Sequence, residues 1–109
     1  MAIVISDNIE SSTGCIASAM NVLGQKWTAL ILRDLFEGPK RFCELERSVG
    51  NINPRTLTQR LIALERQNII AAKDGRYLLT KKGVDLLPIL RQMATWGEKY
   101  PTTKKLGVI

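Results

Sequence analysis

The polar side chains best suited to chemistry follow Asn53-Pro54, where arginine, threonine and glutamine occur close together. An arginine can donate two parallel hydrogen bonds to guanine, and a glutamine can bond adenine in the same way. Threonine can reach either bases or phosphates. This is the chemistry of reading base edges in the major groove of double-stranded DNA. The candidate residues are Arg55, Thr56, Thr58, Gln59 and Arg66.

A single helix is expected to carry these residues, from Asn53 to about Gln67. Asparagine is a strong N-cap, and proline at the first helical position loses no hydrogen bond. At about 100° per residue, Leu57, Leu61 and Leu64 cluster within about 40° and define a core side. The opposite side is led by Arg55, Gln59 and Arg66, with Thr56, Thr58 and Ile62 towards its edges. Base contacts usually come from the N-terminal half of such a helix, which favours the earlier residues over Arg66.

An amphipathic helix has a polar outer side for solvation alone, so this face does not by itself indicate DNA binding. Its place in the chain favours the DNA interpretation, because a short helix and a turn precede it and a hairpin follows. The hairpin is predicted from two apolar runs, 69–73 and 76–79, that flank Asp74-Gly75, a pair preferred in type I′ turns.

Three basic pairs are further candidates for phosphate contacts. The two-residue hairpin loop places Lys73 opposite Arg76, and a phosphate would relieve their repulsion, although two exposed side chains could also splay apart. Lys40 and Arg41 are either backbone contacts or ordinary surface. A third pair, residues 81–82, opens the last helix, where solvated lysines are the simpler interpretation.

The remaining elements complete a known order. A first helix is predicted from about Cys15 to Leu23, with Gly24 as a left-handed cap, and a second begins near Gln25 and ends at Gly38-Pro39. The buried face of this second helix is expected to hold Trp27, Leu30, Ile31, Leu35 and Phe36. A brief extended piece, 40–42, and a short helix, 43–49, come next, with Leu45 and Val49 facing inward. Helices followed by a two-stranded ribbon are typical of a winged helix-turn-helix, a mostly helical α+β fold.

The last helix, expected from Thr80 to about Tyr100, carries apolar residues on an arc too broad for one contact. Pro88 inside the pattern predicts a kink. A symmetric dimer through this helix and the first one would bury the excess and separate two recognition helices by about 34 Å, one DNA turn. The predicted interface residues are Leu86, Ile89, Leu90, Met93 and Trp96. A monomer with its last helix on a larger core is the alternative.

Bulk composition narrows the class of protein. With 109 residues, the chain is expected to form a single winged-helix domain, with an arm over 1–14, a core over 15–100 and a loose tail over 101–109. The net charge of +6 favours a polyanionic partner. The absence of histidine removes His-based triads and His-ligated metals, so neither an enzyme nor a cofactor is expected. No apolar run is long enough for a membrane span or a signal peptide, which predicts a cytoplasmic protein.

Several segments, covering about Cys15 to Gly97, together resemble HxlR-type regulators, which are relatives of the MarR winged-helix proteins. The matching segments are Gly24-Gln25-Lys26-Trp27, Gly38-Pro39-Lys40-Arg41-Phe42, Pro54 to Leu61 and Tyr77 to Gly83, with Leu86 to Leu90 and Trp96. The resemblance implies a homodimer that binds operator DNA near promoters, usually as a repressor and sometimes as an activator. The sequence leaves open whether a small molecule or an oxidant acts as an effector.

The resemblance also places Cys15 where many members carry an N-terminal cysteine, which in some members senses oxidants or electrophiles. A buried, inert thiol is the commoner fate of a cysteine. The hairpin is much shorter than the usual wing of the family. Cys43 stands where a polar capping residue is usual, which predicts a weaker start of that helix.

Two other classes of function compete with the regulator. The same fold could hold a protein in place of DNA, although the basic face with glutamine and threonine favours nucleic acid. A thiol-dependent enzyme built on Cys15 is the second alternative, and it lacks any histidine base.

Overall fold

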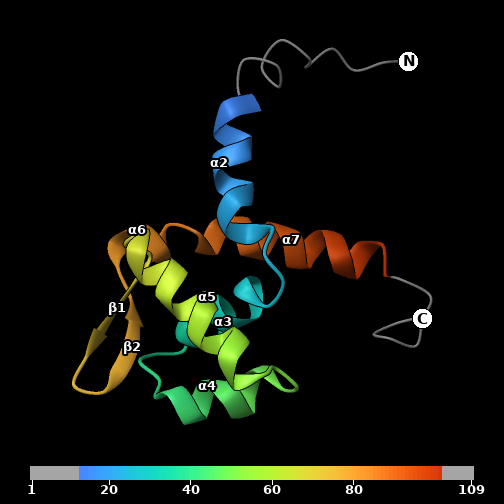
Figure 1. The fold of residues 1–109 in the computed structure, drawn as a ribbon. Coiled ribbons are helices and arrows are strands. Elements are labelled where there is room, and N and C mark those ends of the chain that lie inside the picture. The colour runs from blue at the N-terminus through green and yellow to red at the C-terminus, as the bar shows by residue number, and fades with distance from the viewer. Residues whose placement is uncertain (1–12, 102–109) are drawn as a thin grey trace, which may run out of the picture.

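A computed structural model describes residues 13–101 and folds them into six helices and one β-hairpin (Figure 1). Their order confirms the predicted winged helix-turn-helix. The elements are α2 (Thr13–Leu23), α3 (Thr28–Leu35), α4 (Phe42–Val49), α5 (Pro54–Arg66), β1 (Ile70–Lys73), β2 (Arg76–Leu79), α6 (Lys81–Val84) and α7 (Leu87–Lys99).

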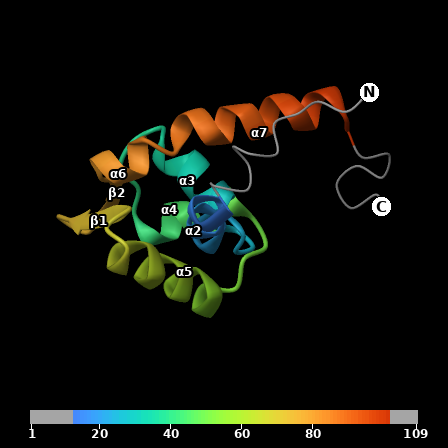
Figure 2. The same ribbon diagram turned by 90° about the horizontal axis from the view of Figure 1, so that it is seen from above.

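The core lies where α3, α4 and α5 meet the first strand. Figure 2 shows α5 and α7 on opposite sides of the body, with α3 and α4 between them. Leu57, Leu61 and Leu64 are buried, so the predicted inner side of α5 is confirmed. Their partners in the core are Ile31, Leu32, Leu35, Leu45, Val49, Ile52, Ile69 and Ile70. The outer side of α5 is thereby fixed towards solvent.

Side-chain caps set the starts of the two helices that precede the hairpin. Asn53 Oδ1 accepts a hydrogen bond from the Arg55 amide at 2.7 Å, as predicted for this N-cap. The α4 helix begins one residue earlier than expected, so Cys43 lies inside it and does not occupy the capping position. The Glu44 carboxylate accepts from the Arg41 amide at 2.8 Å. This bond caps α4 from within, which corrects the prediction of a weak helix start.

The hairpin has the predicted register. Asp74 and Gly75 have φ angles of 53° and 75°, the left-handed pair that a type I′ turn requires. Lys73 is paired directly with Arg76. The amide and carbonyl of Lys40 exchange hydrogen bonds with Tyr77 at 3.0 and 2.7 Å. The extended piece before α4 therefore pairs with β2, at the strand edge that β1 does not cover.

The connection between the first two described helices differs from the prediction. The α3 helix begins at Thr28, not near Gln25, because Trp27 adopts a left-handed φ of 79° and cannot continue a helix backwards. Gly24 is not left-handed; its amide donates to Met20 O and closes α2. Leu30 is 36% exposed and does not join the buried face, whose other predicted members are buried or packed against the core.

The last helix is broken and not merely kinked. It divides into α6 and α7 because Pro88, in the first turn of α7, has no amide to continue the hydrogen-bond ladder of α6. Thr80 caps α6 as predicted, accepting from the Gly83 amide at 3.2 Å. The Leu86 amide donates to Gly83 O at 3.0 Å and closes the turn between the two helices.

The predictions for the N-terminal arm, apart from its last two residues, and for the tail beyond Pro101 lie outside the described residues. Among residues 13–101, no helix combines the length and apolar character needed to cross a membrane.

Candidate nucleic-acid interface

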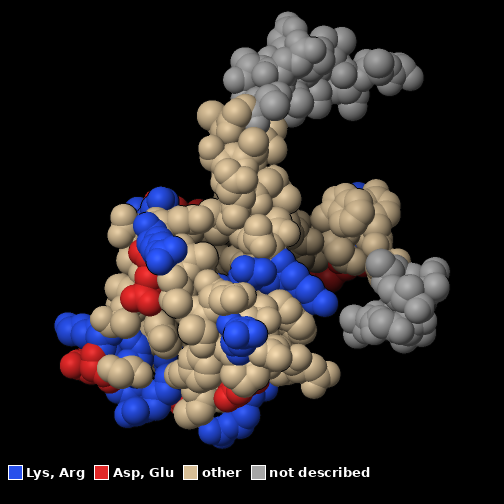
Figure 3. All heavy atoms as spheres, in the orientation of Figure 1, with Lys and Arg blue, Asp and Glu red and all other residues tan. Residues whose placement is uncertain are grey.

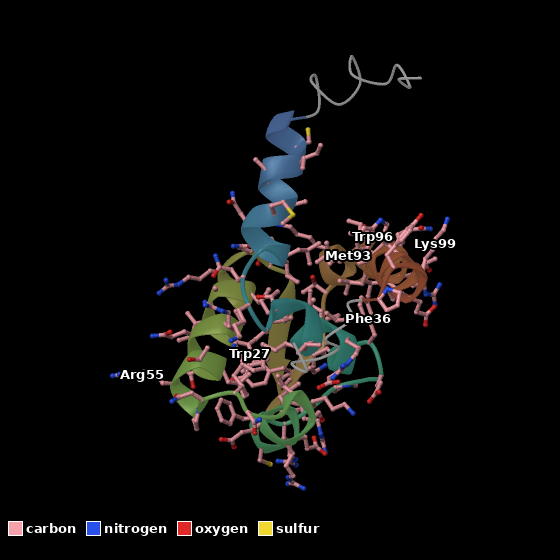
Figure 4. All side chains as sticks on the ribbon, turned by 90° about the vertical axis from the view of Figure 1, so that its right-hand side faces the viewer. Trp27, Phe36, Arg55, Met93, Trp96 and Lys99 are labelled. Carbon is pink, nitrogen blue, oxygen red and sulfur yellow. The ribbon has the colours of Figure 1, made fainter. Side chains whose placement is uncertain are left out.

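The outer side of α5 presents the predicted base-reading residues together. Arg55, Thr58, Gln59 and Arg66 are exposed, and Thr56 is half-buried. Figure 4 shows Arg55 projecting from α5 away from the body. Ile62 lies among these residues with 42% of its surface exposed. An apolar side chain on a polar face can contact the methyl group of thymine. The periodicity had placed Ile62 at an edge of this face and gave it no role.

Four cations at the base and tip of the wing form a second basic surface, the wing cluster, made up of Lys40, Arg41, Lys73 and Arg76. Lys and Arg side chains gather over the hairpin tip at the lower left of Figure 3, with acidic side chains beside them. A Cβ on Gly75 would lie 3.9 Å from Arg41 Nη1, so that guanidinium sits against the turn. The structure thus joins the two basic pairs that the sequence had treated separately.

The members of the wing cluster differ in how freely they can meet a phosphate. Arg41, Lys73 and Arg76 are exposed. The Lys40 ammonium lies 3.1 Å from Glu37 Oε1, and only 23% of its side chain is exposed. Three of the four predicted cations are therefore available to a polyanion, and Lys40 is partly neutralised.

The carboxylate that caps α4 also lies beside the wing cluster. The hydrogen bond from the Arg41 amide holds the pKa of Glu44 below its ordinary value of 4.5, and the nearby charges of Lys40, Arg76 and Arg41 lower this pKa further. Glu44 is therefore ionised at neutral pH and offsets part of the positive charge that faces outward.

The lysine pair of α6 is engaged within the chain. The Lys81 ammonium lies 3.0 Å from Asp85 Oδ1. The Lys82 ammonium donates to Gln67 O at 2.7 Å. Lys81 therefore stays largely solvated, as the simpler interpretation held, whereas Lys82 ties α6 to the residue that follows α5.

Sequence reasoning gave no role to Arg60. Its Nε donates to Lys26 O at 3.3 Å, which joins α5 to the connection between α2 and α3. Arg60 is half-buried, whereas Arg55 and Arg66 are exposed. Arg60 stands three residues after Leu57, at the border between the core side and the outer side of the helix. This position could have predicted that its side chain is partly buried.

The predicted dimer residues divide into two groups. Leu86 and Leu90 pack against the core of their own chain. Ile89, Met93 and Trp96 are 41, 48 and 66% exposed and follow one line along α7. Ile16 and Met20 of α2 are also exposed. The two cysteines, Cys15 on α2 and Cys43 on α4, are exposed as well. The structure brings no three His, Cys, Asp or Glu side chains together as a metal site within residues 13–101.

Comparisons with known proteins agree with this geometry. The family model for the HxlR-like helix-turn-helix matches residues 22–105. YdeP, an uncharacterized HTH-type transcriptional regulator of Bacillus subtilis, is 35% identical over 103 residues, which cover 87% of this chain and 78% of YdeP. The crystal structure of quinone-bound YodB from B. subtilis has a TM-score of 0.73 at 34% identity, covering 78% of this chain and 96% of YodB.

A third relative is the redox regulator HypR in its reduced form. It has a TM-score of 0.69 at 33% identity, covering 77% of this chain and 90% of HypR. The family match spans most of the described residues, including the recognition helix α5 and the wing. The chain therefore belongs to the HxlR-like helix-turn-helix family of transcriptional regulators.

Proposed function

We propose that this regulator binds a specific operator in double-stranded DNA as a homodimer and represses transcription from it. The single observation that carries the proposal is the outer side of α5, where Arg55, Thr58 and Gln59 are exposed above buried leucines. Their donors and acceptors match those of guanine and adenine in the major groove. The wing cluster supplies charge for the flanking phosphates, which set the register without reading sequence.

The homodimer is supported by two helices that extend beyond the core. Figure 1 shows α2 projecting from the body, and the described residues measure 53 × 34 × 22 Å along their principal axes. Exposed apolar side chains on α2 and α7 would become buried between two copies. A two-fold pair would then present two α5 helices to successive major grooves, about 34 Å apart.

The proposed activity is binding without catalysis or a cofactor, in the cytoplasm where the operator is found. Its regulation would act through Cys15, whose thiol is exposed in the first turn of α2. The quinone-bound and redox-regulator descriptions of YodB and HypR support a response to electrophiles or oxidants. Thiol reactivity requires access and a thiolate, and the first of these conditions is met.

The experiment that tests this proposal is selection of genomic DNA fragments by the full chain, with and without a quinone. The expected result is enrichment of a short two-fold symmetric sequence, with an affinity that falls steeply as salt increases. Cys15→Ser should keep this binding and lose the effect of the quinone. Weak binding that does not depend on salt would favour the alternative, a module that holds a protein partner.

A further inference from the structure

The connection between α2 and α3, residues 24–27, is tightly constrained. The Gly24 amide donates to Met20 O at 2.7 Å, and a Cβ on Gly24 would lie only 2.5 Å from the same oxygen. Trp27 has φ 79°, a region that bulky L-residues rarely adopt. Such a conformation persists only when its surroundings fix it. Contacts around the connection must therefore hold Trp27 in this conformation.

Contacts with the body supply this restraint. The Trp27 side chain packs against the core, and the Lys26 ammonium lies 5.0 Å from the centre of its ring. Arg60 Nε on α5 donates to the Lys26 carbonyl at 3.3 Å. The recognition helix thus holds the backbone of the connection at the peptide next to the strained residue.

Arg60 differs from the other two arginines of α5 because its side chain binds within the protein and not at the outer side of the helix. Arg55 and Arg66 are exposed, whereas Arg60 is half-buried and donates inward to a backbone carbonyl. A side chain engaged in this way contributes to the placement of α5 more than to the charge of its outer side.

We propose that Arg60 is a positioning residue that transmits the orientation of α2 to the recognition helix. This inference rests on the proposed function, in which α5 reads base edges. A tilt of α2, whether from pairing with a second copy or from modification of Cys15, acts on residues 24–27 and moves Lys26 O relative to Arg60. Bidentate contacts with bases depend on distance and angle, so a small displacement of α5 weakens specific binding first.

The test compares Arg60→Met with Arg47→Met, which removes the same charge from an exposed position on α4. Dissociation constants are measured over a range of salt concentrations for an operator from the genomic selection and for a random duplex of equal length. Arg60→Met should weaken operator binding about three- to tenfold relative to Arg47→Met, the size expected for one hydrogen bond. Binding to the random duplex and the slope of affinity against salt should match the control.

Several outcomes would overturn the inference. Equal losses on both duplexes, with a salt slope reduced by about one, would show that Arg60 contacts a phosphate directly. Operator binding equal to that of Arg47→Met would show that the inward hydrogen bond has no effect on recognition. An unaltered protein that does not distinguish operator from random DNA would overturn the proposed function, and this inference with it.

A double substitution tests the route of the coupling. Gly24→Ala forces the connection to shift and should also weaken operator binding selectively. Because both changes act on the same contact, Gly24→Ala should add little further loss to Arg60→Met, whereas independent effects would multiply. Multiplying effects would overturn the proposed route. Thermal unfolding shows whether Gly24→Ala is folded, and if it is not, the comparison of Arg60→Met with Arg47→Met decides.

Discussion

At the residue scale, the proposed function gives Arg55 and Gln59 of α5 contacts with bases and gives the wing cluster contacts with phosphates. Arg55→Ala and Gln59→Ala should each lose about 1 to 3 kcal/mol of discrimination at one base pair, because each removes a pair of hydrogen bonds to a base edge. The measurement is the dissociation constant for the operator and for single-base-pair variants of it. Lys73→Ala, in the wing cluster, should weaken binding to all sequences alike. Equal losses on operator and random DNA for Arg55→Ala would contradict the assigned role.

Glu44 gives the wing cluster a measurable pH dependence. The folded state lowers the pKa of this carboxyl below its ordinary value of 4.5. The ionised carboxylate therefore stabilises the fold above that pH, and this stabilisation is lost as the pH falls through the lower, folded value. Glu44→Gln, which keeps an oxygen acceptor but removes the charge, should unfold at a lower temperature than the unaltered chain at pH 7.

The difference between these two proteins should shrink as the pH decreases below about 4.5 and the carboxyl of the unaltered chain becomes protonated. Glu46→Gln, a change of the same kind on the same helix, is the control. A gap in unfolding temperature that stays constant from pH 7 to pH 3 would contradict the contribution of the Glu44 charge.

At the scale of elements, the start of α5 depends on one side chain. Asn53 Oδ1 satisfies the Arg55 amide, which no backbone carbonyl of the helix can reach. Asn53→Ala should lower the free energy of unfolding by about 1 kcal/mol, as measured by urea denaturation. Asn51→Ala, an exposed asparagine in the preceding turn, should change it much less. Equal losses in the two variants would show that the cap does not stabilise α5.

The elements that were predicted correctly are those whose signal is local. The leucine spacing of α5, the Asn53-Pro54 start and the Asp74-Gly75 turn each specify their geometry within a few residues, and each was confirmed. The predicted start of α3 was wrong because tertiary contacts, which no local pattern reveals, impose the left-handed conformation of Trp27. The inward hydrogen bond of Arg60 was missed for the same reason. The Glu44 cap is a local contact, three residues from Arg41, and it was missed because arginine is not a usual N-cap residue.

The break between α6 and α7 was only half predicted. Pro88 predicted a kink, but a proline can either bend a helix or end it, and the sequence does not decide between the two. A kinked helix would keep most of its ladder, whereas here a turn ends α6 at Val84 and α7 begins at Leu87. The restart gives α7 a direction of its own, and in Figure 2 it runs along the side of the body opposite α5.

At the scale of the whole molecule, the placement of α5 and α7 separates the surface for DNA from the surface proposed for the second copy. Ile89, Met93 and Trp96, which form one line along α7, are 41, 48 and 66% exposed, whereas Leu90 of the same helix packs against the core. Leaving such a line in water is unfavourable, and a two-fold partner would cover it with the same line of its own. Pairing through α7 would therefore leave the outer side of α5 open to DNA (Figure 2).

This arrangement predicts that Met93→Glu separates the dimer. A charge within a line of apolar contacts loses its hydration, and in a two-fold interface the substitution occurs twice, close to its own copy. Sedimentation analysis should show a dimer for the unaltered chain and a monomer for the variant. The variant should still unfold cooperatively, but at a lower temperature, because it lacks the stabilisation that pairing gives the folded state. Operator affinity should fall about a hundredfold or more, because two linked half-site contacts become independent. Thr95→Glu adds the same charge elsewhere on α7 and should remain dimeric. A Met93→Glu dimer with full operator affinity would place the interface on another surface.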